Sequence, residues 1–100
     1  MEIRIQSIHF DAAAQLESFI QKKVSKLARY GEEVLSAEVT LKVIKPESAQ
    51  NKEVSIKLEV PKKEDIFSCK VADTFEEAVD LTIDALVKQL QKIKEKNRPK

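Results

Sequence analysis

Four short stretches of the chain alternate apolar with polar residues. In the first, Met1, Ile3 and Ile5 lie on one face of a predicted N-terminal strand. The same alternation over residues 37–43 and 54–60 predicts two further strands. A period of two indicates a strand with one buried and one solvated face, as in a sheet covered on one side only.

The fourth stretch predicts a strand over residues 66–71. Its two faces carry Phe67, Cys69 and Val71 on the more apolar side and Ile66, Ser68 and Lys70 on the other. We therefore expect the side with Cys69 to face the core, where this cysteine would be a small buried hydrophobic residue.

A helix is predicted over about residues 12–30, because apolar residues recur there every three or four positions. Its apolar stripe consists of Leu16, Phe19, Ile20, Val24 and Leu27. Asp11 is the expected N-cap, and Gly31 is the expected C-terminal stop.

A second helix is predicted over about residues 75–96. Its apolar stripe consists of Val79, Ile83, Leu86, Leu90 and Ile93. Thr74 and Glu77 form a capping box at its start, because the hydroxyl and the carboxylate can each satisfy a free backbone N–H.

The predicted element order is β-α-β-β-β-α. Polar connections are expected at residues 45–52 and 61–65. This order predicts an α+β fold, in which a four-stranded sheet carries two helices packed on one face. We expect one domain spanning residues 1–100.

Composition narrows the class of protein. Hydrophobic residues make up 42% and charged residues 35%, which is typical of a soluble globular domain. The only glycine is Gly31, which argues against a glycine-rich phosphate loop. The only cysteine is Cys69, which excludes an internal disulfide and favours a reducing compartment. Because the chain shows neither a signal peptide nor an apolar membrane span, we expect a cytoplasmic protein with no membrane partner.

No pattern in the sequence indicates catalysis. His9 is the only histidine and has no serine or cysteine partner in a recognisable motif, so a surface position is expected. Asp80 and Asp84 are four residues apart but lack a histidine nearby, which suits a solvated helix face better than a metal or acid–base site. We therefore expect no enzyme activity, no cofactor, no metal and no small-molecule substrate.

Positive charge is concentrated in two tracts, although the formal net charge is only +1. The basic residues are Lys22, Lys23, Lys26 and Arg29 in the first, and Lys88, Lys92, Lys94, Lys96, Arg98 and Lys100 in the second. If the helices lie side by side, the two rows can merge into one surface that meets several phosphates. The alternative is that lysines late in a helix stabilise its dipole and keep the protein soluble. Charge alone does not decide between the two.

Aromatic residues give little support for stacking on single-stranded bases. The four phenylalanines fall mostly on apolar stripes, which leaves Tyr30 as the only evident candidate. Recognition of folded RNA by its shape and phosphates fits this pattern better.

Three segments carry a family resemblance. They are Met-x-Ile-x-Ile at the N-terminus, Val24-Ser25-Lys26-Leu27-Ala28-Arg29-Tyr30, and Ala78-Val79-Asp80-Leu81-Thr82-Ile83-Asp84-Ala85-Leu86-Val87-Lys88-Gln89-Leu90-Gln91-Lys92. Together they resemble the ribosome hibernation promoting factors, also called ribosome-associated inhibitor A or sigma-54 modulation proteins. The resemblance covers essentially the whole chain and is most specific in the last helix.

The resemblance implies a fold similar to a double-stranded-RNA-binding domain with an added strand. It also implies binding in the mRNA and tRNA channel of the small ribosomal subunit, against 16S rRNA and neighbouring ribosomal proteins. Such binding blocks initiation and preserves idle ribosomes in stationary phase and stress. Together with the charge tracts, it predicts an rRNA-binding set of Lys22, Lys23, Lys26, Arg29, Lys88, Gln89, Lys92 and Lys96. The free protein is expected to be a monomer.

The chain departs from the family pattern at several positions. Ala85 stands where lysine is usual, and Lys88 replaces the usual arginine, which keeps the charge but loses the bidentate fork. Thr74-Phe75-Glu76 replaces Asp-Met-Tyr, and Ala13 replaces a common threonine. The length corresponds to the short form of the family. The alternative function is a module of the same fold that binds other structured RNA or a protein partner.

Overall fold

The computed structural model describes residues 2–8, 11–27, 34–44, 50–60 and 65–96, with side chains in the last helix described as far as Lys92. The elements are β1 (Glu2–Ile8), α1 (Ala14–Ser25), β2 (Ser36–Val43), β3 (Lys52–Glu59), β4 (Ile66–Ala72) and α2 (Phe75–Lys96). This order confirms the predicted α+β fold. None of the helices in these ranges is long and apolar enough to cross a membrane.

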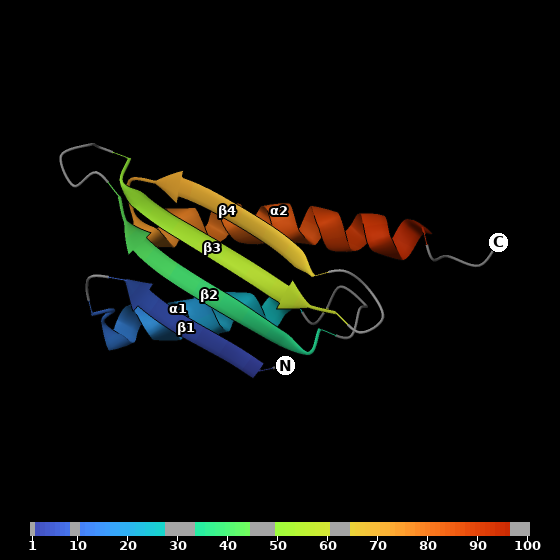
Figure 1. Cartoon of the computed structure of the whole chain (residues 1–100), viewed down its shortest axis with the longest axis horizontal. Helices are drawn as coiled ribbons and strands as arrows, with labels where there is room; N and C mark the ends of the chain where they lie inside the picture. Colours follow the sequence, from blue (N-terminus) through green and yellow to red (C-terminus); the bar gives the residue numbers. More distant parts are fainter. Residues whose placement is uncertain (1, 9–10, 28–33, 45–49, 61–64, 97–100) are drawn as a thin grey trace.

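The strands form one mixed sheet in the order β1-β2-β3-β4. β1 and β2 are parallel and are joined through α1, whereas the β2–β3 and β3–β4 pairs are antiparallel. Both helices lie behind the sheet in Figure 1 and run in the same direction, and the last turns of α2 extend beyond the strands. One face of the sheet is therefore covered by helices, and the other is open.

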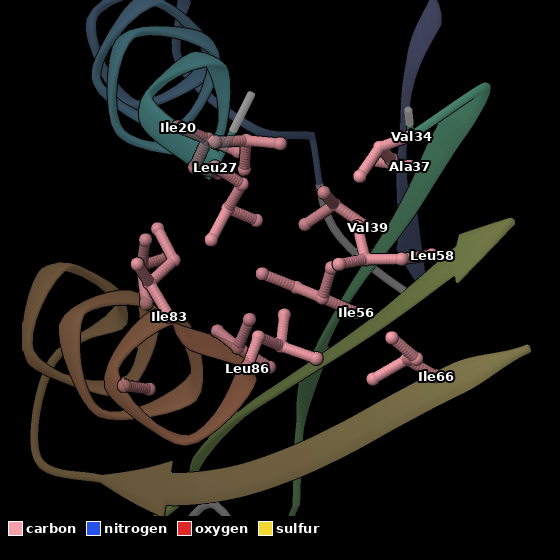
Figure 2. Close-up of a cluster of buried hydrophobic side chains, with 14 of the residues drawn as sticks. Ile20, Leu27, Val34, Ala37, Val39, Ile56, Leu58, Ile66, Ile83 and Leu86 are labelled. Carbon is pink, nitrogen blue, oxygen red and sulfur yellow. The ribbon is translucent and has the colours of Figure 1, made fainter. Parts of the chain in front are cut away.

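The core lies between the helices and the sheet. Figure 2 shows Ile20 and Leu27 on the α1 side and Ile83 and Leu86 on α2, all directed toward the apolar side chains of the sheet. The sheet contributes the buried residues Ala37, Val39, Leu41, Val54, Ile56, Leu58 and Ile66. The predicted inward faces of the second and third strands and the apolar stripes of both helices are thereby confirmed, apart from Ile93, whose side chain lies outside the described residues.

The predicted inward face of β4 is wrong. Ile66 and Ser68 are buried, whereas Phe67 is 57% exposed and Cys69 is also exposed. The cause is the register with β3: Ile66 pairs with Leu58, and Ser68 pairs with Ile56. Paired residues point to the same side of a sheet, so the more polar alternate positions of β4 share the core face of β3.

The predicted boundaries of α2 agree with the structure more closely than those of α1. The N-cap of α1 is Ala13, without a side-chain hydrogen bond, so the assignment of Asp11 is wrong. α1 ends at Ser25, and the expected positions of Tyr30 and Gly31, like that of His9, lie outside the described residues. At α2, the backbone N–H of Glu77 donates to Thr74 Oγ1 at 3.1 Å, which confirms the threonine half of the capping box.

Candidate nucleic-acid interface

The α1 lysines are Lys22 and Lys23 in its last turn and Lys26 at its C-cap. They lie on the solvent side of the helix and along its boundary with α2. Lys22 and Lys26 are exposed, and Lys23 is half-buried. A groove of about 370 Å³ between the helices is lined by Lys23, Lys26, Asp80, Ile83, Asp84 and Val87. One wall of this groove is therefore cationic, and the α2 wall carries two carboxylates.

Lys23 contacts two other side chains of the protein. Its Nζ lies 3.5 Å from Asp80 Oδ1 and 5.5 Å from the centroid of the Phe19 ring. The second contact has the geometry of a cation–π interaction. Of the three α1 lysines, Lys23 is thus the least available to an external phosphate.

Lys88 and Lys92 of α2 project from the side of the helix opposite the core. Lys88 lies two residues from both Leu86 and Leu90, which are fully buried. Two residues correspond to about 200° of rotation around a helix, so Lys88 points away from the sheet. Lys92 follows one turn later, and both lysines are exposed. These two side chains form a cationic row on the outer face of α2.

Carboxylates of α2 face the α1 lysines across the groove. The helices do lie side by side, but Asp80 and Asp84 occupy the α2 wall opposite the α1 lysines. The row of Lys88 and Lys92 begins one turn beyond Asp84. Sequence periodicity could not show this arrangement, because it does not give the rotation of one helix against the other. The merging of the two lysine rows, one of which includes Arg29 outside the described residues, stays a prediction.

Gln89 has a different environment from the lysines beside it. It is half-buried, and its Nε2 donates to the backbone carbonyl of Phe67 at 3.2 Å. This hydrogen bond joins α2 to β4, the outermost strand on that side of the sheet. Gln89 therefore has a role in the fold that its sequence position did not reveal.

Two other members of the predicted set cannot be placed in this way. Arg29 lies outside the described residues, and Lys96 is the last residue of α2, with a side chain that also lies outside them. The exposed cations that the structure places on the helical layer are Lys22, Lys26, Lys88 and Lys92.

Cys69 lies on the open face of the sheet, on the other side from the lysines of the helices. Its thiol donates to Glu53 Oε1 at 3.0 Å. Partial burial raises the pKa of Cys69, and the hydrogen bond to Glu53 and its negative charge raise it further, although a hydrogen bond with Ser55 acts in the opposite direction. A thiol held in the protonated form is a poor nucleophile. Among the residues that the structure describes, no group of three or more potential metal ligands occurs.

Comparison with known proteins identifies a family and a shared fold. The sequence model of the family described as "Sigma 54 modulation protein / S30EA ribosomal protein" matches residues 3–98. Comparison with curated proteins gives no significant match.

Two solved structures have the same fold. The N-terminal domain of Protein Y from Thermus thermophilus is similar with a TM-score of 0.78 and 19% identity, over 93% of this chain and 99% of that one. A ribosomal subunit interface protein from Coxiella burnetii is similar with a TM-score of 0.80 and 23% identity, over 95% of this chain and 99% of that one.

Proposed function

The chain belongs to the sigma 54 modulation protein / S30EA ribosomal protein family, and from this membership we propose that it binds the small ribosomal subunit and keeps it idle. The bound protein occupies the channel that otherwise holds mRNA and tRNA, and it thereby blocks initiation during stationary phase. Its partners are 16S rRNA and neighbouring ribosomal proteins, and it acts in the cytoplasm without catalysis.

The observation that carries this proposal is the placement of four exposed lysines on one layer of the molecule. Lys22 projects from the last turn of α1 and Lys26 from its C-cap, and Lys88 and Lys92 project from α2. Because both helices cover the same face of the sheet, all four cations belong to the helical side (Figure 1). The opposite face has cross-strand neighbours of opposite charge, such as Glu38 beside Lys57, and suits a polyanion less well.

Binding through these lysines relies on phosphate neutralisation. Each lysine that meets a phosphate releases condensed counterions, so the affinity falls as the salt concentration rises. Side chains on two parallel helices can follow the backbone of a folded RNA without reading its bases. This mode needs no exposed aromatic platform.

The proposal is tested by sedimenting the purified protein with small ribosomal subunits. We expect co-sedimentation at roughly 50 mM salt and a clear loss of bound protein at roughly 200 mM salt. A protein that stays in the supernatant at the lower salt concentration would contradict the proposal.

A competition experiment distinguishes binding in the mRNA and tRNA channel from general RNA binding. Added mRNA and initiator tRNA should displace the protein from the small subunit, because the proposed sites overlap. An unrelated structured RNA at the same phosphate concentration serves as the control. If both compete equally, the protein is a general structured-RNA-binding module and does not occupy the channel specifically.

A further inference from the structure

The two edges of the sheet differ in chemistry. On the open face, β1 presents the exposed residues Glu2, Arg4 and Gln6. β4 instead presents Phe67, Cys69 and Val71, of which Phe67 is 57% and Val71 is 37% exposed. Charged side chains on an edge strand discourage pairing with another strand, and an apolar edge favours it. β4 is therefore the edge suited to association.

The backbone direction of β4 can be read from one contact. The carbonyl of Phe67 accepts a hydrogen bond from Gln89 and therefore points away from β3. In an antiparallel strand, the N–H and C=O of one residue point to the same side, and the side alternates along the strand. The amides of Cys69 and Val71 consequently point outward as well. In the part of the chain that the structure describes, β4 has a strand neighbour on one side only.

We propose that β4 is a self-association edge, and that two copies of the chain pair through it antiparallel with Cys69 at the two-fold axis. In this register, Phe67 lies opposite Val71 of the second copy, and Cys69 lies opposite Cys69 of the second copy. An aromatic residue opposite a β-branched residue is a favourable cross-strand pair. The three exposed apolar side chains of each copy would form one continuous ladder.

The register also allows backbone hydrogen bonds between the two strands and keeps the two Lys70 side chains from facing each other. The residues that face each other across the interface are those whose amides point outward, so they can exchange hydrogen bonds as ladder pairs. Lys70 lies opposite Ser68 of the second copy, so the two lysines are not placed opposite each other. The interface is isologous, as a closed dimer requires.

The pairing brings the two α2 helices next to each other, because α2 is the helix that packs on β4. The open faces of the two sheets continue into each other, so both pairs of helices lie on the same side of the widened sheet. The Gln89 side chain already donates a hydrogen bond to the Phe67 carbonyl. This side chain must move away at each end of the interface before the strands pair, and the lost hydrogen bond weakens the dimer.

Sedimentation equilibrium tests the proposal directly. Between roughly 10 μM and 1 mM, the range expected for a small interface, the mean mass should rise from the 11.4 kDa of one chain toward twice that value. Cys69→Lys and Cys69→Glu should each remain monomeric, because they place like charges at the two-fold axis. An equimolar mixture of the two variants should associate again, since the charges across the axis then become opposite.

Matched variants on the opposite edge serve as controls. Gln6 lies on the same row across the sheet as Cys69, through Thr40 and Ser55. Gln6→Lys and Gln6→Glu should associate like the unaltered chain, and circular dichroism verifies the fold of every variant. A monomeric mass at all concentrations, or association of the folded Cys69→Lys variant by itself, would overturn the proposal.

Discussion

Lys23 Nζ lies 3.5 Å from Asp80 Oδ1, across the groove between α1 and α2. Both side chains remain partly solvated, with exposed fractions of 32% and 53%. A pair of this kind contributes at most about 1 kcal/mol to stability. Its larger effect concerns charge: Asp80 neutralises one lysine of the α1 row and, together with Asp84, places negative charge along the groove that Lys26 also lines.

The first prediction is that Asp80→Asn strengthens binding to the small subunit. The substitution releases Lys23 and removes a carboxylate that repels phosphate. We expect a gain of about 0.5–1 kcal/mol, or roughly two- to fivefold in affinity at low salt. Titration of labelled protein against small subunits measures the change. Glu38→Gln removes the same charge from the open face and should have no effect, so an equal gain in both variants would show that only net charge matters.

The second prediction concerns the cationic row of α2. Replacing both Lys88 and Lys92 by glutamine should weaken small-subunit binding by roughly ten- to a hundredfold at low salt. It should also make the plot of log affinity against log salt concentration less steep, by about two in slope. Both side chains are exposed, so the free energy of unfolding should change by less than about 0.5 kcal/mol. Titrations at several salt concentrations, with urea unfolding alongside, measure these quantities.

The matched control for this double variant removes two lysines from the open face. Lys42→Gln with Lys57→Gln has the same net charge and disrupts an exposed ion pair, between Lys57 and Asp65, which contributes little to stability. Its affinity for the small subunit should stay close to that of the unaltered chain. Comparable losses in the two double variants would exclude the outer face of α2 as the binding surface.

The sequence was sufficient to predict the elements but not every face. The bounds of α2 followed from Thr74 at its start and from an apolar stripe that persists to its end. The face of β4 could not be predicted, because Phe67 and Cys69 are more apolar than Ser68, which is buried. Which side of an edge strand meets the core is decided by its register with β3, and this register is a long-range property.

In the candidate site, too, the sequence predicts features within one helix but not contacts between elements that are distant in sequence. Helical spacing correctly placed Lys88 and Lys92 on a common exposed side, because that spacing depends only on the helix itself. The contact of Lys23 with Asp80 and that of Gln89 with the Phe67 carbonyl each join two elements that are distant in sequence. Neither contact leaves a signal in a single sequence, so the internal partners of Lys23 and Gln89 emerged only from the structure.

The third prediction concerns the start of α2. Thr74→Ala removes the oxygen that accepts the Glu77 N–H, and it should lower the free energy of unfolding by about 1 kcal/mol. Thr74→Ser retains a hydroxyl at the cap and should restore most of this loss. Urea unfolding of the three proteins measures the differences. Equal destabilisation by alanine and serine would show that the threonine methyl group, and not the cap, stabilises this end.

The fourth prediction is that the Cys69 thiol is alkylated slowly in the unaltered protein and faster when its hydrogen-bond partner Glu53 is replaced. Partial burial and the neighbouring Glu53 raise the pKa of Cys69, so less thiolate is present near pH 8 and alkylation by iodoacetamide is slower than in the urea-unfolded chain. Glu53→Gln removes the negative charge, which should lower the pKa and speed alkylation of the folded protein. The rate is followed from pH 7 to 10, a range that brackets the ordinary cysteine pKa of about 8.5, and the midpoint should move downward in the variant. Glu38→Gln, a charge removal on the same face but not in contact with the thiol, should leave the midpoint unchanged. A midpoint that does not respond to Glu53→Gln would mean that burial alone controls the thiol.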